Sequence, residues 1–286
     1  MKFTVLPAVE IHCWGGLGSQ LYAWALHQRV SLNFTRRRIC LVFHTGGVTE
    51  RLEELGAFFP DAQIVKDFSR KLEGGNTSSG SSAQWTRKLG KFLALKLGLI
   101  SSCNNEAEFK KLKPWVLQIR GHYSDCVVPE EVLIWIIRET KKLGIDKEDF
   151  LKSDFLGIHL RLGDLLTLSE KSPTNPESVR VVLQELADKY NYLKLVAFSD
   201  SPDLIRKMLH GPHLESITVL DLGAWETLLI LSDAKILIGT SSKISIWAVL
   251  LGLTRGTLST AALPQNLQAK VSRNLGTRNY DSLKFY

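Results

Sequence analysis

The chain alternates short apolar runs with helical stretches from its first residues. Residues 3–13 alternate apolar and polar side chains, the glycine-rich turn Gly15–Gly18 follows, and residues 19–34 have the apolar spacing of a helix, with Ser19 as its expected N-cap. A second apolar run covers residues 39–43. Because a strand–helix–strand order joins parallel strands, this opening predicts an α/β fold with a parallel sheet.

The second half of the chain repeats this alternation. Before the second half begins, a short strand is expected at 116–119 and a helix at 130–142. The polar residues 143–154 are read as a hinge between the two halves. After the hinge, strands are expected at 155–160, 193–198, 217–220 and 236–238, and helices at 176–190, 201–209, 225–232 and from 245 onward. We therefore expect two α/β domains, residues 1–150 and 151–286.

Composition narrows the class of protein. The 286 residues carry a net charge of +7, which favours anionic partners such as phosphates or anionic lipids, although a merely basic soluble protein has the same charge. No nucleic-acid-binding motif accompanies the charge, so nucleic acid is not an expected partner. The sequence has no apolar run of roughly 18 residues and no signal-peptide pattern, so a cytoplasmic protein is expected.

The ligands of a metal site are not apparent in the sequence. The four cysteines form no C-x-x-C pair and are read as buried free thiols, the histidines form no H-E-x-x-H pair, and no D-x-D triplet occurs. Neither a bound metal nor another cofactor is therefore expected.

One segment suggests contact with a membrane. After the glycine- and serine-rich loop 74–82, the stretch Trp85–Ile100 has apolar residues on one helical face and basic residues mostly off it. Such a helix suits peripheral contact with the inner face of an anionic membrane. The alternative is an ordinary helix packed on the core, with its basic face in solvent.

Four motifs stand where a strand meets a turn or a helix. The first, at 15–20, offers glycine backbone and a helix N-terminus to phosphate, or is simply a structural turn. The second follows an apolar strand, and its polar residues fall where ligands bind in doubly wound sheets; the alternative is a surface salt bridge. The third and fourth end further strands with hydroxyls, which suit phosphate or merely cap helices. Their residues are Gly15, Gly16, Leu17, Gly18, Ser19 and Gln20; His159, Arg161 and Asp164; Ser199 and Asp200; and Thr240, Ser241, Ser242 and Ser245.

In this order, the motifs resemble those of the inverting α-1,2-fucosyltransferases and their α-1,6- and peptide O-fucosyltransferase relatives. The family's G-G-L-G-N-Q is similar to 15–20, its H-x-R-R-G-D to 159–164, its F-S-D to 198–200, and its N-S-S-F-S-W-W-A to 241–248. A weaker similarity to G-Y-F-Q-S covers 119–124 and includes His122. This chain departs from the family at Ser19, Leu162, Lys243 and Ile246.

The resemblance implies a GT-B-like fold, with two Rossmann-type domains and a nucleotide-sugar cleft between them. It implies GDP-fucose as donor, a glycan acceptor, α-1,2 transfer to galactose with inversion, and no divalent metal. The stretch Trp85–Ile100 adds a lipid-linked glycan to the alternatives for the acceptor. Related enzymes use other nucleotide sugars or peptide acceptors, and a non-catalytic sugar- or nucleotide-binding relative is also open. On this resemblance, the N-terminal domain (1–150) is expected to bind the acceptor and the C-terminal domain (151–286) the donor.

The resemblance also suggests roles for single residues. Arg161 would stabilise the departing diphosphate, as a cation must where no metal does so. Asp164 would orient Arg161 or act as base, and Glu226 is a weaker candidate base that would equally serve as a helix N-terminal carboxylate. His159 and Asp200 would contact the nucleotide, and the glycine loop and the 240–245 hydroxyls would hold phosphate or sugar.

Overall fold

The computed structural model describes residues 6–44, 52–56, 64–67, 92–141, 153–160, 175–199, 201–208, 217–278 and 280–286. The chain divides into two compact units, Met1–Val132 and Leu133–Tyr286. The division falls within a helix, α4 (Glu130–Lys141), and so precedes the expected boundary at residue 150. Ile134, Ile137 and Thr140 of α4 line a cavity together with helices of the second unit, which explains why most of α4 belongs there.

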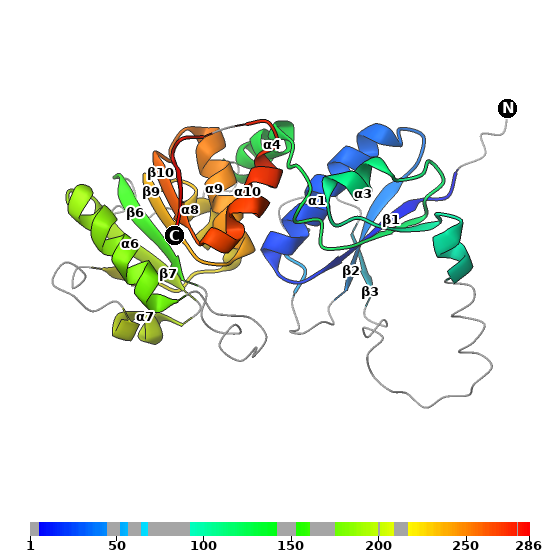
Figure 1. Ribbon diagram of the computed structural model, residues 1–286. Coiled ribbons are helices and arrows are strands. Elements are labelled where there is room, and N and C mark those ends of the chain that lie inside the picture. The colour runs from blue at the N-terminus through cyan, green and yellow to red at the C-terminus, as the bar shows by residue number, and fades with distance from the viewer. Residues whose placement is uncertain are drawn as a thin grey trace. The chain divides into compact units, whose positions relative to one another are not determined.

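The first unit contains one parallel sheet with the strand order β3-β2-β1-β5-β4. Helix α1 packs on β1 and β2 (Figure 1). Strands β1 and β2 are buried along most of their length, as expected for strands covered on both faces. The elements are β1 (Val9–Trp14), α1 (Leu17–Asn33), β2 (Ile39–His44), β3 (Ile64–Asp67), β4 (Ile100–Ser102), α3 (Glu106–Lys110) and β5 (Gln118–Arg120).

The second unit contains a six-stranded parallel sheet with the order β11-β10-β9-β6-β7-β8. Counted within this unit from its other edge, the order is 3-2-1-4-5-6, that of the Rossmann fold. The elements are β6 (Phe155–Leu160), α6 (Pro176–Lys189), β7 (Lys194–Ser199), α7 (Pro202–Met208), β8 (Thr218–Leu220), α8 (Ala224–Leu231), β9 (Ile236–Gly239), α9 (Lys243–Arg255), β10 (Thr260–Leu263), η2 (Gln265–Leu267), α10 (Gln268–Leu275) and β11 (Leu283–Phe285).

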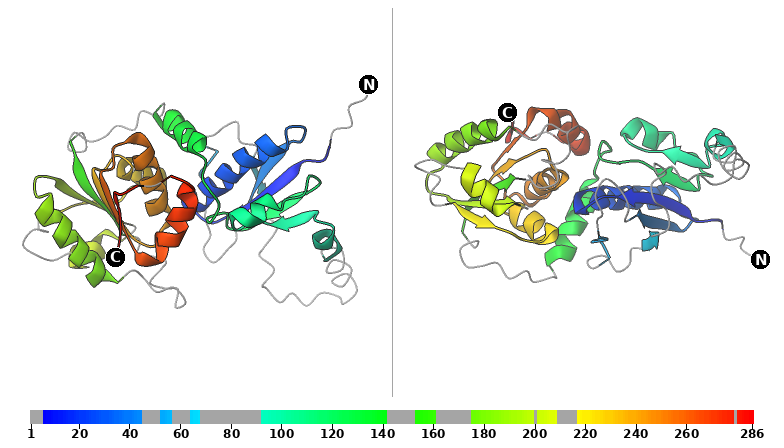
Figure 2. Two further views of the ribbon diagram at one scale, coloured as in Figure 1. Left: turned by 45° about the horizontal axis from the view of Figure 1, so that its top comes forward. Right: turned by 90° about the horizontal axis from the view of Figure 1, so that it is seen from below.

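Alternation along the strands builds the two layers of this unit. Leu156, Ile158 and Leu160 of β6 join a core formed with α6 and α7, while Gly157, on the opposite face, lies against Leu231 of α8. The sheet accordingly lies between α6 on one side and α9 on the other (Figures 1 and 2). The expected α/β class with two Rossmann-type units is confirmed.

Several elements begin or end elsewhere than expected. Helix α1 begins at Leu17 with Gly16 as its N-cap, so Ser19 lies in the first turn and is not the cap. The expected helix at Trp85–Ile100 is described only from residue 92: residues 92–96 are helical, but Ile100 belongs to strand β4. Gly98, with a φ of +70°, ends the helical part.

The four cysteines are free and buried, as expected. None of the helices in the described ranges is long and apolar enough to cross a bilayer. The described residues also contain no group of three or more His, Cys, Asp or Glu side chains placed to hold a metal ion.

Candidate functional site

The central feature of the second unit is the carboxyl end of its sheet between β6 and β9, where the strand order reverses. Ligands of doubly wound proteins bind at this switch point. His159 near the end of β6 is paired in register with Gly239 at the end of β9. The carboxyl ends of β6 and β9 therefore lie side by side at one edge of the sheet, although they are far apart in the sequence.

A buried hydrogen bond joins the two motifs at this edge. The Nδ1 atom of His159 lies 2.7 Å from the hydroxyl oxygen of Ser245, and both side chains are buried. If the hydroxyl donates to Nδ1, the imidazole carries its proton on Nε2, where it can donate to an anionic group. The second and fourth sequence motifs thus belong to one structural unit.

The first turn of α9 presents hydroxyls and backbone amides at this edge. Ser242 is the N-cap, and its hydroxyl accepts a hydrogen bond of 3.2 Å from the backbone N–H of Ile244. Thr240 is buried just after β9, and Ser241 donates to the Oδ1 atom of Asn266 at 3.2 Å. The N-terminus of a 13-residue helix carries partial positive charge, so this turn suits an anion.

Close packing between α9 and the sheet depends on Gly239. A Cβ atom at this position would lie 2.7 Å from the Cβ of Ser245 and 2.7 Å from Leu263. The carbonyl of Gly239 also accepts a hydrogen bond of 2.8 Å from the Tyr286 hydroxyl. Neither Gly239 nor Tyr286 was among the predicted site residues. Gly239 ends the strand before a hydroxyl-rich turn, which was a usable signal, but nothing in the sequence pointed to Tyr286.

The other predicted site residues of the second unit lie at the same edge, cap a helix, or fall outside the residues that the structure describes. Ser199 ends β7, beside β6, and its hydroxyl accepts from the backbone N–H of Ser201 at 3.0 Å. Glu226 accepts from the backbone N–H of Gly223 at 2.8 Å and so caps α8, which is the structural role that the sequence left open. Arg161, Asp164 and Asp200, together with Leu162, lie outside the described residues.

In the first unit, the glycine loop occupies the equivalent place. Gly15, with a φ of +90°, follows β1, and Gly16 caps α1, so Leu17 and Gly18 already lie in the helix. The neighbouring strands β1 and β5 again flank the point where the strand order reverses. The loop therefore directs the N-terminus of α1 to the carboxyl edge of the first sheet.

Gln20 holds this loop in place. Its amide nitrogen donates to the carbonyls of Gly15 at 3.0 Å and Leu52 at 2.9 Å, and its oxygen accepts from the backbone N–H of Glu54 at 2.9 Å. The side chain is buried and occupied by backbone contacts. Gln20 thus positions the loop, and its predicted contact with the donor stays a prediction.

A constrained turn after β5 displays His122 at the same edge. A Cβ at Gly121 would lie 2.3 Å from the carbonyl oxygen of Cys103, and Tyr123 adopts a φ of +57°, which is rare for a side chain of this size. The buried hydroxyl of Tyr123 donates to the carbonyls of His12 and, at 3.0 Å, of Ile119. These contacts hold the turn, which leaves His122 exposed.

Three aromatic rings, those of His12, Trp14 and His44, stack on one another in the carboxyl halves of β1 and β2. The sequence analysis missed them. The rings of Trp14 and His44 lie 4.7 Å apart at 12°, and Nδ1 of His12 lies 2.8 Å from Nε2 of His44. Trp14 is half-buried and directly precedes the glycine loop. The sequence positions could have indicated this stack, because His12 and Trp14 are two residues apart on one strand and so share a face, and His44 ends the neighbouring strand.

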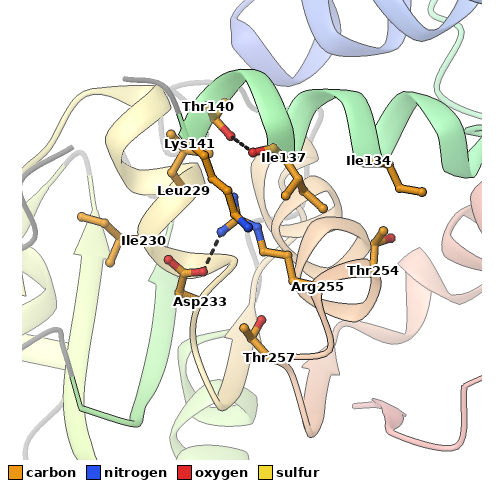
Figure 3. A pocket seen from close by; sticks show the side chains of 10 residues that line it. All are labelled: Ile134, Ile137, Thr140, Lys141, Leu229, Ile230, Asp233, Thr254, Arg255 and Thr257. Atoms are coloured by element: carbon orange, nitrogen blue, oxygen red, sulfur yellow. Dashed lines mark hydrogen bonds and ion pairs between the residues drawn. The ribbon is translucent and has the colours of Figure 1, made fainter. Parts of the chain in front are cut away.

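A cavity of about 500 Å³ in the second unit lies at the opposite edge of its sheet. It is lined by α4 and by the carboxyl ends of α8 and α9, which point to the amino ends of the strands. Within it, Arg255 lies 2.6 Å from the carboxylate of Asp233 (Figure 3). Arg255 also lies 2.9 Å from the Ser232 hydroxyl. This cavity is therefore separate from the edge that carries the sequence motifs.

The strand order and the polar edge between β6 and β9 define a doubly wound α/β protein with its candidate site at the switch point. The sequence matches the family Glycosyl transferase family 11 over residues 127–273, just over half of the chain. The chain belongs to this family, the α-1,2-fucosyltransferase family of the sequence resemblance, and is a glycosyltransferase.

Comparison with solved structures returns remote likenesses. The E. coli heptosyltransferase WaaC with ADP-2-deoxy-2-fluoro heptose is 11% identical, with 98% of this chain and 92% of that chain covered and a TM-score of 0.44. The S. aureus MnaA–UDP structure is 11% identical over 90% and 79% of the two chains, with a TM-score of 0.48. A family 9 glycosyl transferase from Veillonella parvula is 12% identical over 91% and 81%, with a TM-score of 0.40. No curated protein sequence matches the chain.

Proposed function

We propose that the chain transfers fucose from GDP-fucose to a hydroxyl of a glycan acceptor, with inversion and without a divalent metal. An α-1,2 linkage to galactose is the proposed product. The observation that carries the proposal is the buried His159–Ser245 contact, because it joins two motifs of the matched family at the switch point of a Rossmann sheet.

The donor's diphosphate is assigned to the first turn of α9. Ser242 and Ser245 lie within this turn, and helix N-termini bind phosphate through free amides and the helix dipole. The proposed contacts on the nucleotide side are His159 and Asp200, the latter accepting from guanine or ribose. The glycine loop of the first unit is proposed to contact phosphate or fucose.

The proposed chemistry is a single displacement. The acceptor oxygen attacks the anomeric carbon of fucose, the bond from that carbon to the β-phosphate oxygen breaks, and its electron pair leaves with GDP. The acceptor proton passes to a base, for which Asp164 is the candidate, since the carboxylate of Glu226 already caps α8. Arg161 is assigned to the growing negative charge on GDP.

The test is a pair of substitutions, Arg161→Ala and Arg161→Lys, with Arg180→Ala as the matched control. Arg180 is an exposed arginine paired with Glu177 on the surface of α6. We expect Arg161→Ala to lower the rate of GDP release onto acceptor by about 10²–10³, Arg161→Lys to recover part of it, and Arg180→Ala to act like wild type. An Arg161→Ala protein with unchanged folding and near wild-type turnover contradicts the assignment.

Donor identity is tested separately by thermal stability. GDP-fucose at 100 times its Kd should stabilise the protein by about 2.7 kcal/mol, and UDP-sugars should not. Stabilisation by another nucleotide sugar would assign a related glycosyltransferase, and binding of GDP without turnover on glycan or peptide acceptors would assign a non-catalytic relative. A lipid-linked glycan is included among the acceptors, because the sequence of Trp85–Ile100 suggests peripheral contact with a membrane.

A further inference from the structure

The first unit carries a surface at the amino edge of its sheet that the proposed transfer reaction does not use. Six large apolar side chains there are 48% to 61% exposed: Leu6, Phe92, Leu93, Leu95, Leu97 and Trp115. Exposed apolar residues in such a group mark interaction sites, whereas single ones need no explanation.

Hydrogen bonds fasten the segments of this surface to one another. The indole N–H of Trp115 donates to the carbonyl of Leu97 at 2.8 Å. The guanidinium of Arg37 donates to the carbonyls of Pro7 and Pro114, each at 2.9 Å. The four segments 6–8, 34–38, 92–99 and 111–117 each precede a strand of one parallel sheet, so they lie at the same edge. That edge is opposite to the carboxyl ends, where the glycine loop and His122 lie.

The charge of these four segments has one sign. They contain no aspartate or glutamate, and they carry six cationic side chains: Arg36, Arg37, Arg38, Lys96, Lys111 and Lys113. The Lys96 ammonium lies 4.7 Å from the centre of the Phe92 ring, and Lys96 is exposed, so a cationic group stands directly beside the apolar residues. Lys113 is also exposed and lies beside Gly98.

We propose that this basic–apolar surface, the exposed residues of the four segments, docks the protein on an anionic phospholipid membrane. Leucine and aromatic side chains enter the boundary between head groups and acyl chains, tryptophan is favoured at that depth, and lysine and arginine pair with lipid phosphates. Nucleic acid would satisfy the cations but leave the leucines without a partner. The apolar residues therefore decide between the two anionic partners.

The proposal places the interfacial helix differently from the sequence pattern. The sequence analysis predicted that a single helix over residues 85–100 contacts the membrane. In the structure, the described helical part supplies residues 92–96, and Trp115 and the arginines 36–38 come from elsewhere in the chain. Membrane docking at this edge leaves the carboxyl edge of the first sheet away from the lipid surface.

The test is sedimentation of the full chain with vesicles of phosphatidylcholine alone or mixed with phosphatidylglycerol. We expect binding only to the anionic vesicles, weakened by high salt. The double variant Lys96→Glu/Lys113→Glu should bind about 30-fold more weakly, which is about 2 kcal/mol at 1.4 kcal/mol per tenfold. Its control is Lys189→Glu/Lys194→Glu, which makes the same charge change on exposed lysines of the second unit, one of them also beside an aromatic ring.

A second pair of variants tests the apolar contribution. Trp115→Ala and Leu95→Gln should each weaken vesicle binding, while Tyr192→Ala, which removes an exposed aromatic ring from the second unit, should not. Equal losses in the control variants, equal binding to neutral vesicles, or binding to DNA with none to anionic vesicles would overturn the proposal. All variants should keep the wild-type thermal shift with GDP-fucose, so failure of membrane docking and failure of the donor assignment are distinguishable.

Discussion

Single residues at the carboxyl edge of the second sheet have contacts that only the folded chain reveals. His159 and Ser245 are 86 residues apart in sequence and 2.7 Å apart in space. The sequence predicted both as donor contacts, because each stands at a strand end or helix start. It did not predict that they touch, since no local pattern encodes the pairing of β6 with β9.

This contact leads to a double-mutant prediction. His159→Gln and Ser245→Ala should each lower the free energy of unfolding, because each removes one partner of a buried hydrogen bond. Denaturant unfolding of the two single variants and the double variant should show a coupling energy of about 0.5–3 kcal/mol. Both single variants should also bind GDP more weakly in calorimetry. Additive losses would contradict a direct interaction between the two side chains.

A second residue-scale prediction concerns the pH dependence of stability. The guanidinium of Arg29 contacts both carboxylate oxygens of Glu106, at 2.7 and 2.8 Å, and lowers the pKa of that carboxyl group, helped by the backbone N–H of Val127. A lowered folded-state pKa means that the contribution is complete above the unfolded pKa of about 4.5 and is lost as the pH falls through the folded value.

The measurement is urea unfolding of wild type and Glu106→Gln between pH 7 and pH 3. Wild type should be more stable than the variant at pH 7, and the difference should shrink below about pH 4.5. Glu177→Gln is the control, because Glu177 makes a similar pair with Arg180 on an exposed surface, where such pairs contribute little. A difference that stays constant down to pH 3 would show that the ion pair is not its source.

At the scale of elements, the regular parts of both units followed from the sequence. Strands β6, β7 and β9 were predicted within a residue or two because they are apolar runs buried on both faces. Strands β4 and β11 have three residues each and form by pairing with a neighbour, which no local pattern records. Strand β10, Thr-Ala-Ala-Leu, has small side chains with little strand preference of their own.

The two ends of α9 allow a matched prediction about the site. Gly239→Ala should push the first turn of α9 away from β9, because the new Cβ would lie 2.7 Å from that of Ser245. Gly256→Ala, at the C-cap of the same helix, adds a side chain at a φ of +73° but meets no atom within 4 Å. Both variants should lose about 1–3 kcal/mol of stability.

Only Gly239→Ala should weaken GDP binding, because only that end of α9 lies at the switch point. Thermal unfolding measures the first effect and titration calorimetry with GDP the second. If the two variants lose similar stability but bind GDP with equal affinity, the donor does not bind at the N-terminus of α9.

At the scale of the whole molecule, the two units divide the proposed tasks. The second unit holds the family match from β6 to α10 and the His159–Ser245 contact, and the first holds the glycine loop at one edge of its sheet and the basic–apolar surface at the other. The number of units was predictable, because the α/β alternation restarts after the polar stretch at 143–154. Their boundary was not, because α4 precedes that stretch yet lies with α8 and α9.

This division predicts two separable patterns of hydrogen exchange in the full chain. GDP should slow exchange of backbone amides in 153–160 and 236–246, because these segments meet at the switch point, and should leave 92–99 unchanged. Anionic vesicles should slow exchange in 92–99 and 111–117 and leave 236–246 unchanged, since a bound surface exchanges more slowly than an open one. Mass spectrometry of peptic fragments resolves these segments.

The glycine loop at 15–20 supplies the discriminating peptide, because the proposed reaction requires it to respond to donor and not to lipid. Protection of that loop by vesicles alone would mean that the membrane covers the carboxyl edge of the first sheet, and the docking surface would then have to be reassigned to the opposite edge.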